Sequence, residues 1–246
     1  MGTAVTDKLS ESKFYYDQGH DHWRNGNIEL AISCFEECVR IGHPYFKAAA
    51  LVSLASLAGD VGDKQRQLSY QKEIAGLPDE DSRFVPSRTM GWALTATGEY
   101  DRAAEAYQRA LHLGDTDPRL VLNFAELELI RQRYDAAAEL LSRLEGLADP
   151  RVVLMSAALG VFLTALRGRD REVMRPLTKF LGTLQSSGLP SDLMWDFKEI
   201  SPTLAKITEP NNSAIVGRMV DVLTRKISVQ EFLKEFSGLL PEKQSS

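Results

Sequence analysis

The stretch Gly98-Glu99-Tyr100-Asp101-Arg102-Ala103-Ala104-Glu105-Ala106-Tyr107 decides how the chain is organised, because a related stretch follows it at a fixed distance. Gln132-Arg133-Tyr134-Asp135-Ala136-Ala137-Ala138-Glu139-Leu140-Leu141 begins 34 positions later. A period of this length is typical of helix hairpins that stack into a solenoid. Glycines at a spacing of about 36 residues continue the rhythm in both directions, and each is predicted to form a turn. They are Gly26, Gly62 and Gly168.

Small and bulky side chains alternate in register within the predicted second helices. Their spacing lines one face of a helix. We expect the small residues to lie where the two helices of a hairpin approach most closely, and the bulky ones to fill the gap beside them. The small set is Ala31, Ala103 and Ala137, and the bulky set is Phe35, Tyr107 and Leu141.

The pattern Gly98-x-Tyr100-x-x-Ala103-x-x-x-Tyr107-x-x-Ala110 resembles the second-helix signature of the tetratricopeptide repeat family. Gly26-x-Ile28-x-x-Ala31-x-x-x-Phe35-x-x-Cys38 is similar, with a cysteine in a small-residue position. The fourth unit departs from the pattern because Gln132 replaces the turn glycine. The resemblance implies an all-α fold: a right-handed helix-hairpin solenoid of about five tetratricopeptide-like repeats with a C-terminal helical cap.

The period extends over residues 12–187 and is then lost, which predicts two regions. The first is the repeat solenoid, and the second is a C-terminal helical capping segment over residues 188–246. An open solenoid leaves its last apolar face bare, so an irregular cap is expected there. The five units are expected at about residues 12–45, 48–81, 84–117, 118–151 and 154–187.

Three further helices are predicted in the capping segment, at about residues 191–200, 213–226 and 228–236. The last of them opens with Ser228 and Glu231, which are spaced as in a capping box.

The fifth unit has two unusual features. Its first helix, at residues 152–166, is apolar nearly all round, which suggests that both of its sides are covered. Its return helix contains Pro176, so this helix either starts late, near Arg175, or kinks.

Composition limits the kinds of partner. The formal net charge is −5 and the isoelectric point is about 5.5, whereas nucleic-acid binders usually carry a basic footprint. The sequence contains no run of about eighteen apolar residues, so no membrane span is expected. The first residues show no basic stretch followed by an apolar one, so no secretory signal is expected. We therefore expect a cytoplasmic protein that binds neither nucleic acid nor membrane.

Two histidines and two cysteines in the first unit raise the question of a metal site, because zinc favours such ligands. They are His20, His22, Cys34 and Cys38. However, Cys38 occupies a small-residue packing position and His22 lies on the packing stripe of its helix. Reduced core thiols are the favoured interpretation, and neither a metal nor another cofactor is expected.

Catalytic signatures are also lacking, since the chain has neither a Gly-rich phosphate loop nor a nucleophile elbow. Two pairs of carboxylates, Glu36 with Glu37 and Glu126 with Glu128, are interpreted as solvated helix faces. The sequence therefore predicts a protein without enzymatic activity.

The resemblance implies that the first helices of successive hairpins line a concave groove that holds peptides. Arg88 and Trp92 are four residues apart and would project together, and such residue types are enriched at binding hot spots. The alternative is that Trp23 and Trp92 pack against the neighbouring hairpin. The groove candidates are Tyr16, His20, Trp23, Val52, Ser56, Arg88, Trp92, Arg119, Asn123, Glu126 and Phe162.

Two functions remain open from the sequence. The first is a non-enzymatic interaction module, a scaffold or adaptor, that binds a peptide segment or partner protein in its concave groove. The second is a regulatory receptor whose groove ligand, a small molecule or a peptide, repositions the C-terminal helices. Exposed solenoid ends would also allow a homo-oligomer.

Overall fold

The computed structural model describes residues 3–83, 85–169, 172–190 and 197–239, and within these ranges the regular structure is helical, with no strand. The chain divides into two compact units, Met1–Gly114 and Asp115–Ser246.

The first unit consists of three helix hairpins with one short helix before the third. In each hairpin the two helices are joined by a short turn and pack along each other. The helices are α1 (Thr3–Arg24) with α2 (Ile28–Ile41), α3 (Pro44–Asp60) with α4 (Lys64–Ala75), the short α5 (Asp79–Ser82), and α6 (Ser87–Ala96) with α7 (Tyr100–His112).

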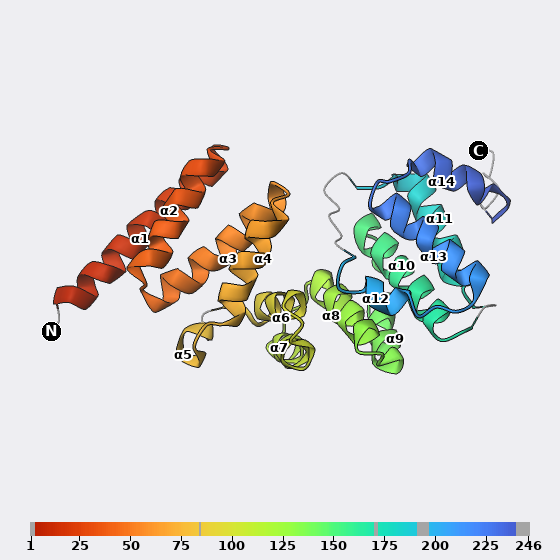
Figure 1. Cartoon of the computed structure of the whole chain (residues 1–246), viewed down its shortest axis with the longest axis horizontal. Coiled ribbons are helices and arrows are strands. Elements are labelled where there is room, and N and C mark those ends of the chain that lie inside the picture. Colours follow the sequence, from red (N-terminus) through yellow and green to blue (C-terminus); the bar gives the residue numbers. More distant parts are fainter. Residues whose placement is uncertain (1–2, 84, 170–171, 191–196, 240–246) are drawn as a thin grey trace. The chain divides into compact units, whose positions relative to one another are not determined.

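Successive hairpins of the first unit pack in chain order (Figure 1). α3 contacts both helices of the preceding hairpin, and α4 contacts α6 of the next one. Each hairpin therefore covers an apolar face that its neighbour could not bury alone, which is the arrangement of a repeat solenoid.

The second unit begins with two hairpins and ends with an irregular helical segment. Its helices are α8 (Pro118–Ile130) with α9 (Tyr134–Ser142), α10 (Pro150–Leu166) with α11 (Met174–Ser187), then α12 (Ser201–Leu204), α13 (Pro210–Leu223), α14 (Val229–Glu235) and the 3-10 helix Ser237–Leu239.

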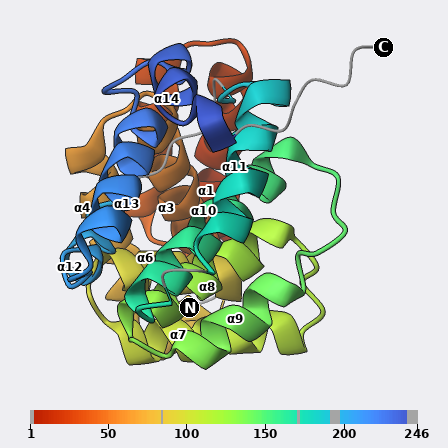
Figure 2. The same cartoon turned by 90° about the vertical axis from the view of Figure 1, so that its right-hand side faces the viewer.

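α10 is the central helix of the second unit. It contacts α8 and α9 of the preceding hairpin, its own partner α11, and α13 of the C-terminal segment. Figure 2 shows α10 between α11 and α13. This confirms the prediction that both sides of the nearly all-apolar helix are covered.

The C-terminal helices close the last hairpin. The Phe232 ring on α14 meets the Phe180 ring on α11 edge-on, with centroids 5.8 Å apart, and both side chains are fully buried. α14 begins with the predicted capping box, in which Ser228 Oγ accepts from the Glu231 amide at 3.1 Å. α14 therefore packs on the last hairpin through a buried aromatic contact.

Some helix boundaries differ from the prediction. α1 begins at Thr3 rather than near residue 12, so the first helix is longer than a repeat requires. α11 begins at Met174, which places Pro176 in its first turn and confirms the late start rather than the kink. The helix predicted at 191–200 lies partly outside the described residues, and residues 197–200 form turns that lead into α12.

The predicted turns all have a left-handed residue. Gly98 has a φ of 82°, and the other turn glycines of the series are similar. In the fourth unit Gln132 takes this position with a φ of 60°. A side chain is strained in this region, because its Cβ crowds the following carbonyl oxygen.

Replacing Gln132 with glycine should therefore stabilise the protein. We expect a gain of about 0.5–1 kcal/mol, since the relief of strain exceeds the extra entropy of an unfolded glycine. Urea unfolding of Gln132→Gly and of the wild type would measure it. A loss of stability would show that the glutamine side chain contributes more than its backbone strain costs.

The small residues that the sequence places between the helices of a hairpin lie in a buried seam. Ala31, Ala103 and Ala137 are each 0% exposed, as predicted. Phe35 and Tyr107 fill the adjacent space and are buried, whereas Leu141 is only partly buried in the fourth unit.

Glycines on the first helices complete this seam. A Cβ atom built on Gly91 would lie 2.6 Å from the Tyr107 ring, and one on Gly19 would lie 2.6 Å from the Phe35 ring. Each glycine precedes its aromatic partner by 16 residues. The aromatic ring of the second helix thus packs directly on the backbone of the first.

Gly91→Ala should destabilise the first unit. Alanine favours a helix by up to about 1 kcal/mol, but here its methyl group would displace the Tyr107 ring from a closely packed seam. Overpacking of this kind costs about 1–3 kcal/mol, so we expect a net loss of about 1–2 kcal/mol in denaturant unfolding.

Gly217→Ala is the matched control, because it also lies within a helix. A Cβ atom at Gly217 meets no atom within 4 Å outside its own helical turn. This substitution should be neutral or stabilising by up to about 1 kcal/mol. Equal effects of the two substitutions would contradict the close contact between Gly91 and Tyr107.

Candidate functional site

α1 carries a row of aromatic side chains. Tyr16 and His20 lie one helical turn apart with ring centroids 4.6 Å apart, and His20 stacks on Trp23 at 5.9 Å. Beneath this row the fully buried Phe35 ring contacts all three of them. The α1 aromatic row, Tyr16, His20 and Trp23, is therefore fixed from below while each of its members remains partly exposed.

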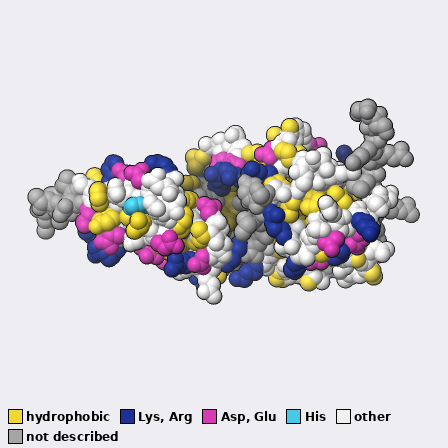
Figure 3. Space-filling model, turned by 90° about the horizontal axis from the view of Figure 1, so that it is seen from above, with side chains coloured by type: hydrophobic (Ala, Val, Ile, Leu, Met, Phe, Trp, Pro, Cys, Tyr) yellow, Lys and Arg dark blue, Asp and Glu magenta, His cyan; other side chains and the backbone are white. Residues whose placement is uncertain are grey.

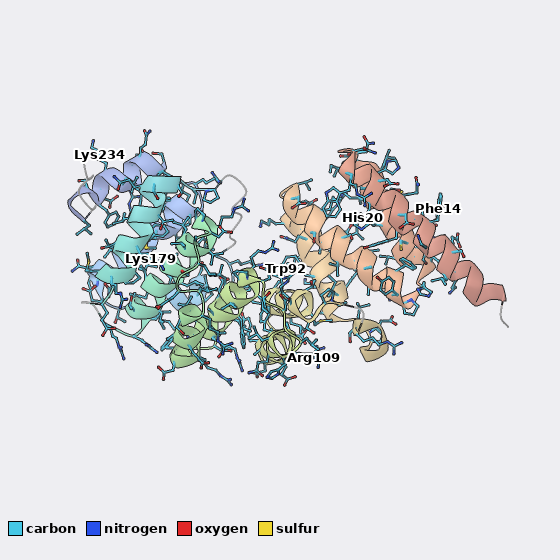
Figure 4. The ribbon with its side chains drawn as sticks, turned by 180° about the vertical axis from the view of Figure 1, so that it is seen from behind. Phe14, His20, Trp92, Arg109, Lys179 and Lys234 are labelled. Atoms are coloured by element: carbon cyan, nitrogen blue, oxygen red, sulfur yellow. The ribbon has the colours of Figure 1, made fainter. Side chains whose placement is uncertain are left out.

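α3 supports the α1 aromatic row from the next hairpin. The His20 Nε2 atom lies 3.4 Å from Ser53 Oγ, which is 6% exposed. The Tyr16 ring contacts the Phe46 ring of α3 with centroids 5.6 Å apart. The row thus belongs to a surface formed by the first helices of two successive hairpins (Figure 4).

The surroundings of the α1 aromatic row favour the uncharged forms of His20 and Tyr16. Burial lowers the pKa of His20, and the nearby Arg24 lowers it further, while Asp17 and Asp21 act in the opposite direction. Burial also raises the pKa of Tyr16. At neutral pH the row therefore presents an apolar surface with hydrogen-bonding groups and no charge of its own. On one face of the first unit, Figure 3 shows a histidine among hydrophobic and acidic side chains.

The lowered pKa of His20 makes stability depend on pH. The folded protein binds the proton less readily than the unfolded chain, so the contribution of neutral His20 is complete above the ordinary histidine pKa of about 6.5 and is lost as the pH falls below it. We expect the wild type to lose more stability between pH 7.5 and 5.5 than His20→Gln. Urea midpoints at the two pH values test this, and equal losses would contradict it.

Arg88 and Trp92 lie four residues apart on α6, as predicted, and both are partly exposed. Trp92 also packs against the core cluster of the first unit, as does Trp23. Each tryptophan thus buries part of its ring in packing and exposes the remainder. For both tryptophans, packing against the neighbouring hairpin therefore describes the buried part of the ring, and the groove interpretation concerns the exposed part.

In the second unit, α8 carries the other polar candidates. Arg119 is exposed and pairs with Asp117, the N-cap residue of its own helix, at 2.7 Å. Asn123 and Glu126 are partly exposed further along α8. The Arg119–Asp117 pair restrains the guanidinium at the helix N-terminus.

Phe162 lies in the core rather than on the exposed surface that the sequence suggested. Its side chain is 0% exposed, and its ring meets Phe197 edge-on with centroids 6.2 Å apart. The C-terminal segment, whose packing the sequence does not reveal, covers this position of α10. We therefore leave Phe162 out of the proposed binding surface.

The interpretation of the acidic pairs as solvated helix faces is wrong for Glu128. It is 2% exposed and pairs at 2.6 Å with Arg131, the C-cap residue of α8. Removing one member of such a pair leaves a buried charge without its counterion, which is costly. The i, i+3 spacing of Glu128 and Arg131 is the sequence signal that would have indicated this pair.

The cysteines of the first unit are free thiols. The Cys38 thiol is buried and donates to the carbonyl oxygen of Ser12 at 3.3 Å, and burial raises its pKa to about 12. A thiolate, the form that binds metals, is therefore disfavoured there. Among the described residues, no group of three or more histidine, cysteine or acidic side chains is arranged to hold a metal ion.

The fold, with its glycine-marked turns and small-residue seams, defines a helical-repeat protein. Two family models, both described as tetratricopeptide repeat, match residues 12–41 and 88–151. These two segments of the chain therefore carry tetratricopeptide repeats. No curated protein matches it.

The matched residues coincide with the clearest hairpins. Residues 12–41 cover α2 and most of α1, and residues 88–151 cover α6 to α9. Tetratricopeptide repeats mediate interactions between proteins, using the extended surface that stacked repeats create. Over the described residues, no helix is both long and apolar enough to cross a membrane.

Proposed function

We propose that the chain is a non-enzymatic interaction module, a scaffold or adaptor, that binds a peptide segment or partner protein on the exposed surface of its first helices. The observation that carries this proposal is the α1 aromatic row, Tyr16, His20 and Trp23, held half-exposed over the buried Phe35. Partly exposed aromatic rings on a rigid support are typical anchors for a partner.

The arrangement of these side chains favours binding energetically. Aromatic rings offer a large contact area, and their packing against Phe35 and α3 already restricts them. Little conformational entropy remains to be lost when a partner binds, so more of the contact energy appears as affinity. Arg88 and Trp92 on α6, and Asn123 on α8, supply further groups of the kinds found at hot spots or in hydrogen bonds to a peptide.

We further propose a cytoplasmic location. The free thiols of Cys34 and Cys38 support a reducing compartment. We also retain self-association as part of the proposal, because the large apolar side chain of Phe14 is 58% exposed on α1, in the first hairpin.

Affinity capture tests the interaction surface. The full-length protein, immobilised, would be compared with Arg88→Ala combined with Asn123→Ala in capture of partners from native cytoplasm. The proposal expects a partner that the wild type retains and that the double variant retains at least about fivefold less. Arg109→Ala combined with Asn211→Ala is the matched control, since both residues are exposed and lie outside the first helices (Figure 4 labels Arg109).

The proposal fails if no captured partner distinguishes the Arg88 and Asn123 variant from its control. A general loss of stability in the double variant would be recognised from its thermal melt. In that case Arg88→Lys and Asn123→Gln, which preserve polarity, provide a second comparison.

The receptor alternative requires the C-terminal helices to move when the surface is occupied. The burial of Phe232 against Phe180, and of Phe197 against Phe162, favours a fixed cap instead. Our proposal therefore keeps a repeat region at residues 12–187 and a capping segment at residues 188–246. Truncation near Gly188 separates the two: aggregation supports a cap, and increased peptide affinity supports an occluding switch.

A further inference from the structure

A groove of about 770 Å³ lies in the second unit between the second helices of its two hairpins, α9 and α11, with α10 as its floor. We refer to it as the α9–α11 groove. Its volume falls within the range of about 300–1,000 Å³ that is typical of ligand sites. The α8 candidates Arg119, Asn123 and Glu126 do not line it, so it is separate from the surface proposed above.

Small residues line the floor of the α9–α11 groove. Ala157 and Gly160 lie along α10, and the buried Leu163 follows them. A Cβ atom on Gly160 would lie 3.2 Å from Pro176 of α11, so the two helices approach closely at this point. Leu141, partly exposed on α9, forms an apolar wall. The groove volume of about 770 Å³ leaves room for a small apolar side chain away from the contact between Gly160 and Pro176.

The α11 side of the groove carries two cations that pair with no other residue in the part of the chain that the structure describes. Arg175 and Lys179 are four residues apart on one face of α11 and are both exposed (Figure 4 labels Lys179). Neither side chain forms an ion pair or hydrogen bond with another described residue. Glu172, at the start of this side, already pairs with Arg169 at 3.2 Å, and Glu145 lies across the groove on α9.

We propose that the α9–α11 groove is a second docking surface, and that it takes an acidic segment of a partner protein. Carboxylates of this segment pair with Arg175 and Lys179, and a small apolar side chain enters the floor beside Leu141 and Leu163. Charge complementarity selects the occupant, because Arg175 and Lys179 have no ion-pair partner among the described residues, whereas Glu172 on the same wall already pairs with Arg169. This surface goes beyond the proposed function, which concerns the first helices.

The spacing of the two cations indicates what the segment looks like. Four residues of α-helix correspond to a rise of about 6 Å. Acidic side chains at positions i and i+4 of a helical partner, or at i and i+2 of an extended one, have a similar separation. A partner segment of either form can therefore pair with both cations at once.

Peptide selection on the full-length protein tests this proposal. A displayed library of random peptides of about twelve residues would be selected on the wild type, and the recovered peptides would be titrated against variants by fluorescence anisotropy. We expect a class of peptides enriched in Asp and Glu with interspersed Ala or Leu. Their affinity should fall at least about tenfold for Arg175→Glu combined with Lys179→Glu, because two attractive pairs become repulsive.

Matched variants separate this result from other causes. Lys206→Glu combined with Lys234→Glu makes the same change of charge at exposed positions of the second unit outside the groove, and should alter affinity less than twofold. Ala138→Phe fills the groove from α9 and should weaken binding without lowering the melting temperature, because Ala138 is partly exposed. Arg88→Ala combined with Asn123→Ala should leave this class of peptides unaffected.

Three results would overturn the proposal: recovery of no acidic class, an equal loss of affinity in the two charge-reversal variants, or retained binding in Ala138→Phe. Loss of the acidic class in the Arg88 and Asn123 variant would instead assign these peptides to the first-helix surface. The two docking surfaces can therefore fail independently.

Discussion

Ala103→Arg is expected to lower the free energy of unfolding of the first unit by about 4 kcal/mol or more. Ala103 is 0% exposed at the seam of the α6–α7 hairpin, where Tyr107 packs on the backbone of Gly91. An arginine there adds a long side chain to a full core and a charge without a buried partner, and the costs of overpacking and of desolvation add together. Urea unfolding monitored by circular dichroism measures the loss.

Gln108→Arg is the control for this substitution. It adds the same charge to the same helix at an exposed position, and should change the free energy of unfolding by no more than about 0.5 kcal/mol. If Ala103→Arg were as stable as this control, Ala103 could not lie in the seam.

Phe232→Ala should cost about 3–5 kcal/mol, the usual range for removing a fully buried aromatic ring. The substitution leaves a cavity beside Phe180, and α14 loses the buried ring that anchors it to α11. The Arg218–Glu235 ion pair, at 2.7 Å, also connects α14 to α13, but it is exposed and contributes little. Amide hydrogen exchange should show α14 losing protection before α10.

Lys234→Ala, on the same helix but exposed, should leave both the stability and the exchange pattern nearly unchanged. If Phe232→Ala also had no effect, the C-terminal helices would not function as a cap. The outcome bears directly on the choice between an adaptor and a receptor with mobile C-terminal helices.

The hairpins were predictable because the features that define them are local. Gly98 and its counterparts mark left-handed turns, and Ala103 and Tyr107 keep a helical spacing within one stretch of sequence. The even spacing also predicted a turn at Gln132, and the structure adds that this residue takes the left-handed conformation of the glycine that it replaces. The sequence also contains a local signal for the seam contact between Gly91 and Tyr107. The two residues are 16 positions apart, and the same separation recurs between Gly19 and Phe35.

The remaining features depend on contacts between distant segments. Phe162 has the spacing of a surface residue on a first helix, but the packing of Phe197 against it buries the ring. Glu128 similarly lies on a helix whose other candidates are partly exposed, yet the fold encloses it with Arg131. The α9–α11 groove results from the separation of two second helices, which no periodicity in the chain describes.

The most direct test of the central claim, that the chain is built from interlocked helix hairpins, is a nuclear Overhauser measurement on the full-length protein. The account predicts strong cross-peaks from the Gly91 Hα protons to the Tyr107 ring and from the Gly19 Hα protons to the Phe35 ring. The glycine protons should also be shifted by the ring currents. Absence of both sets of cross-peaks in the folded protein would contradict the hairpin seam.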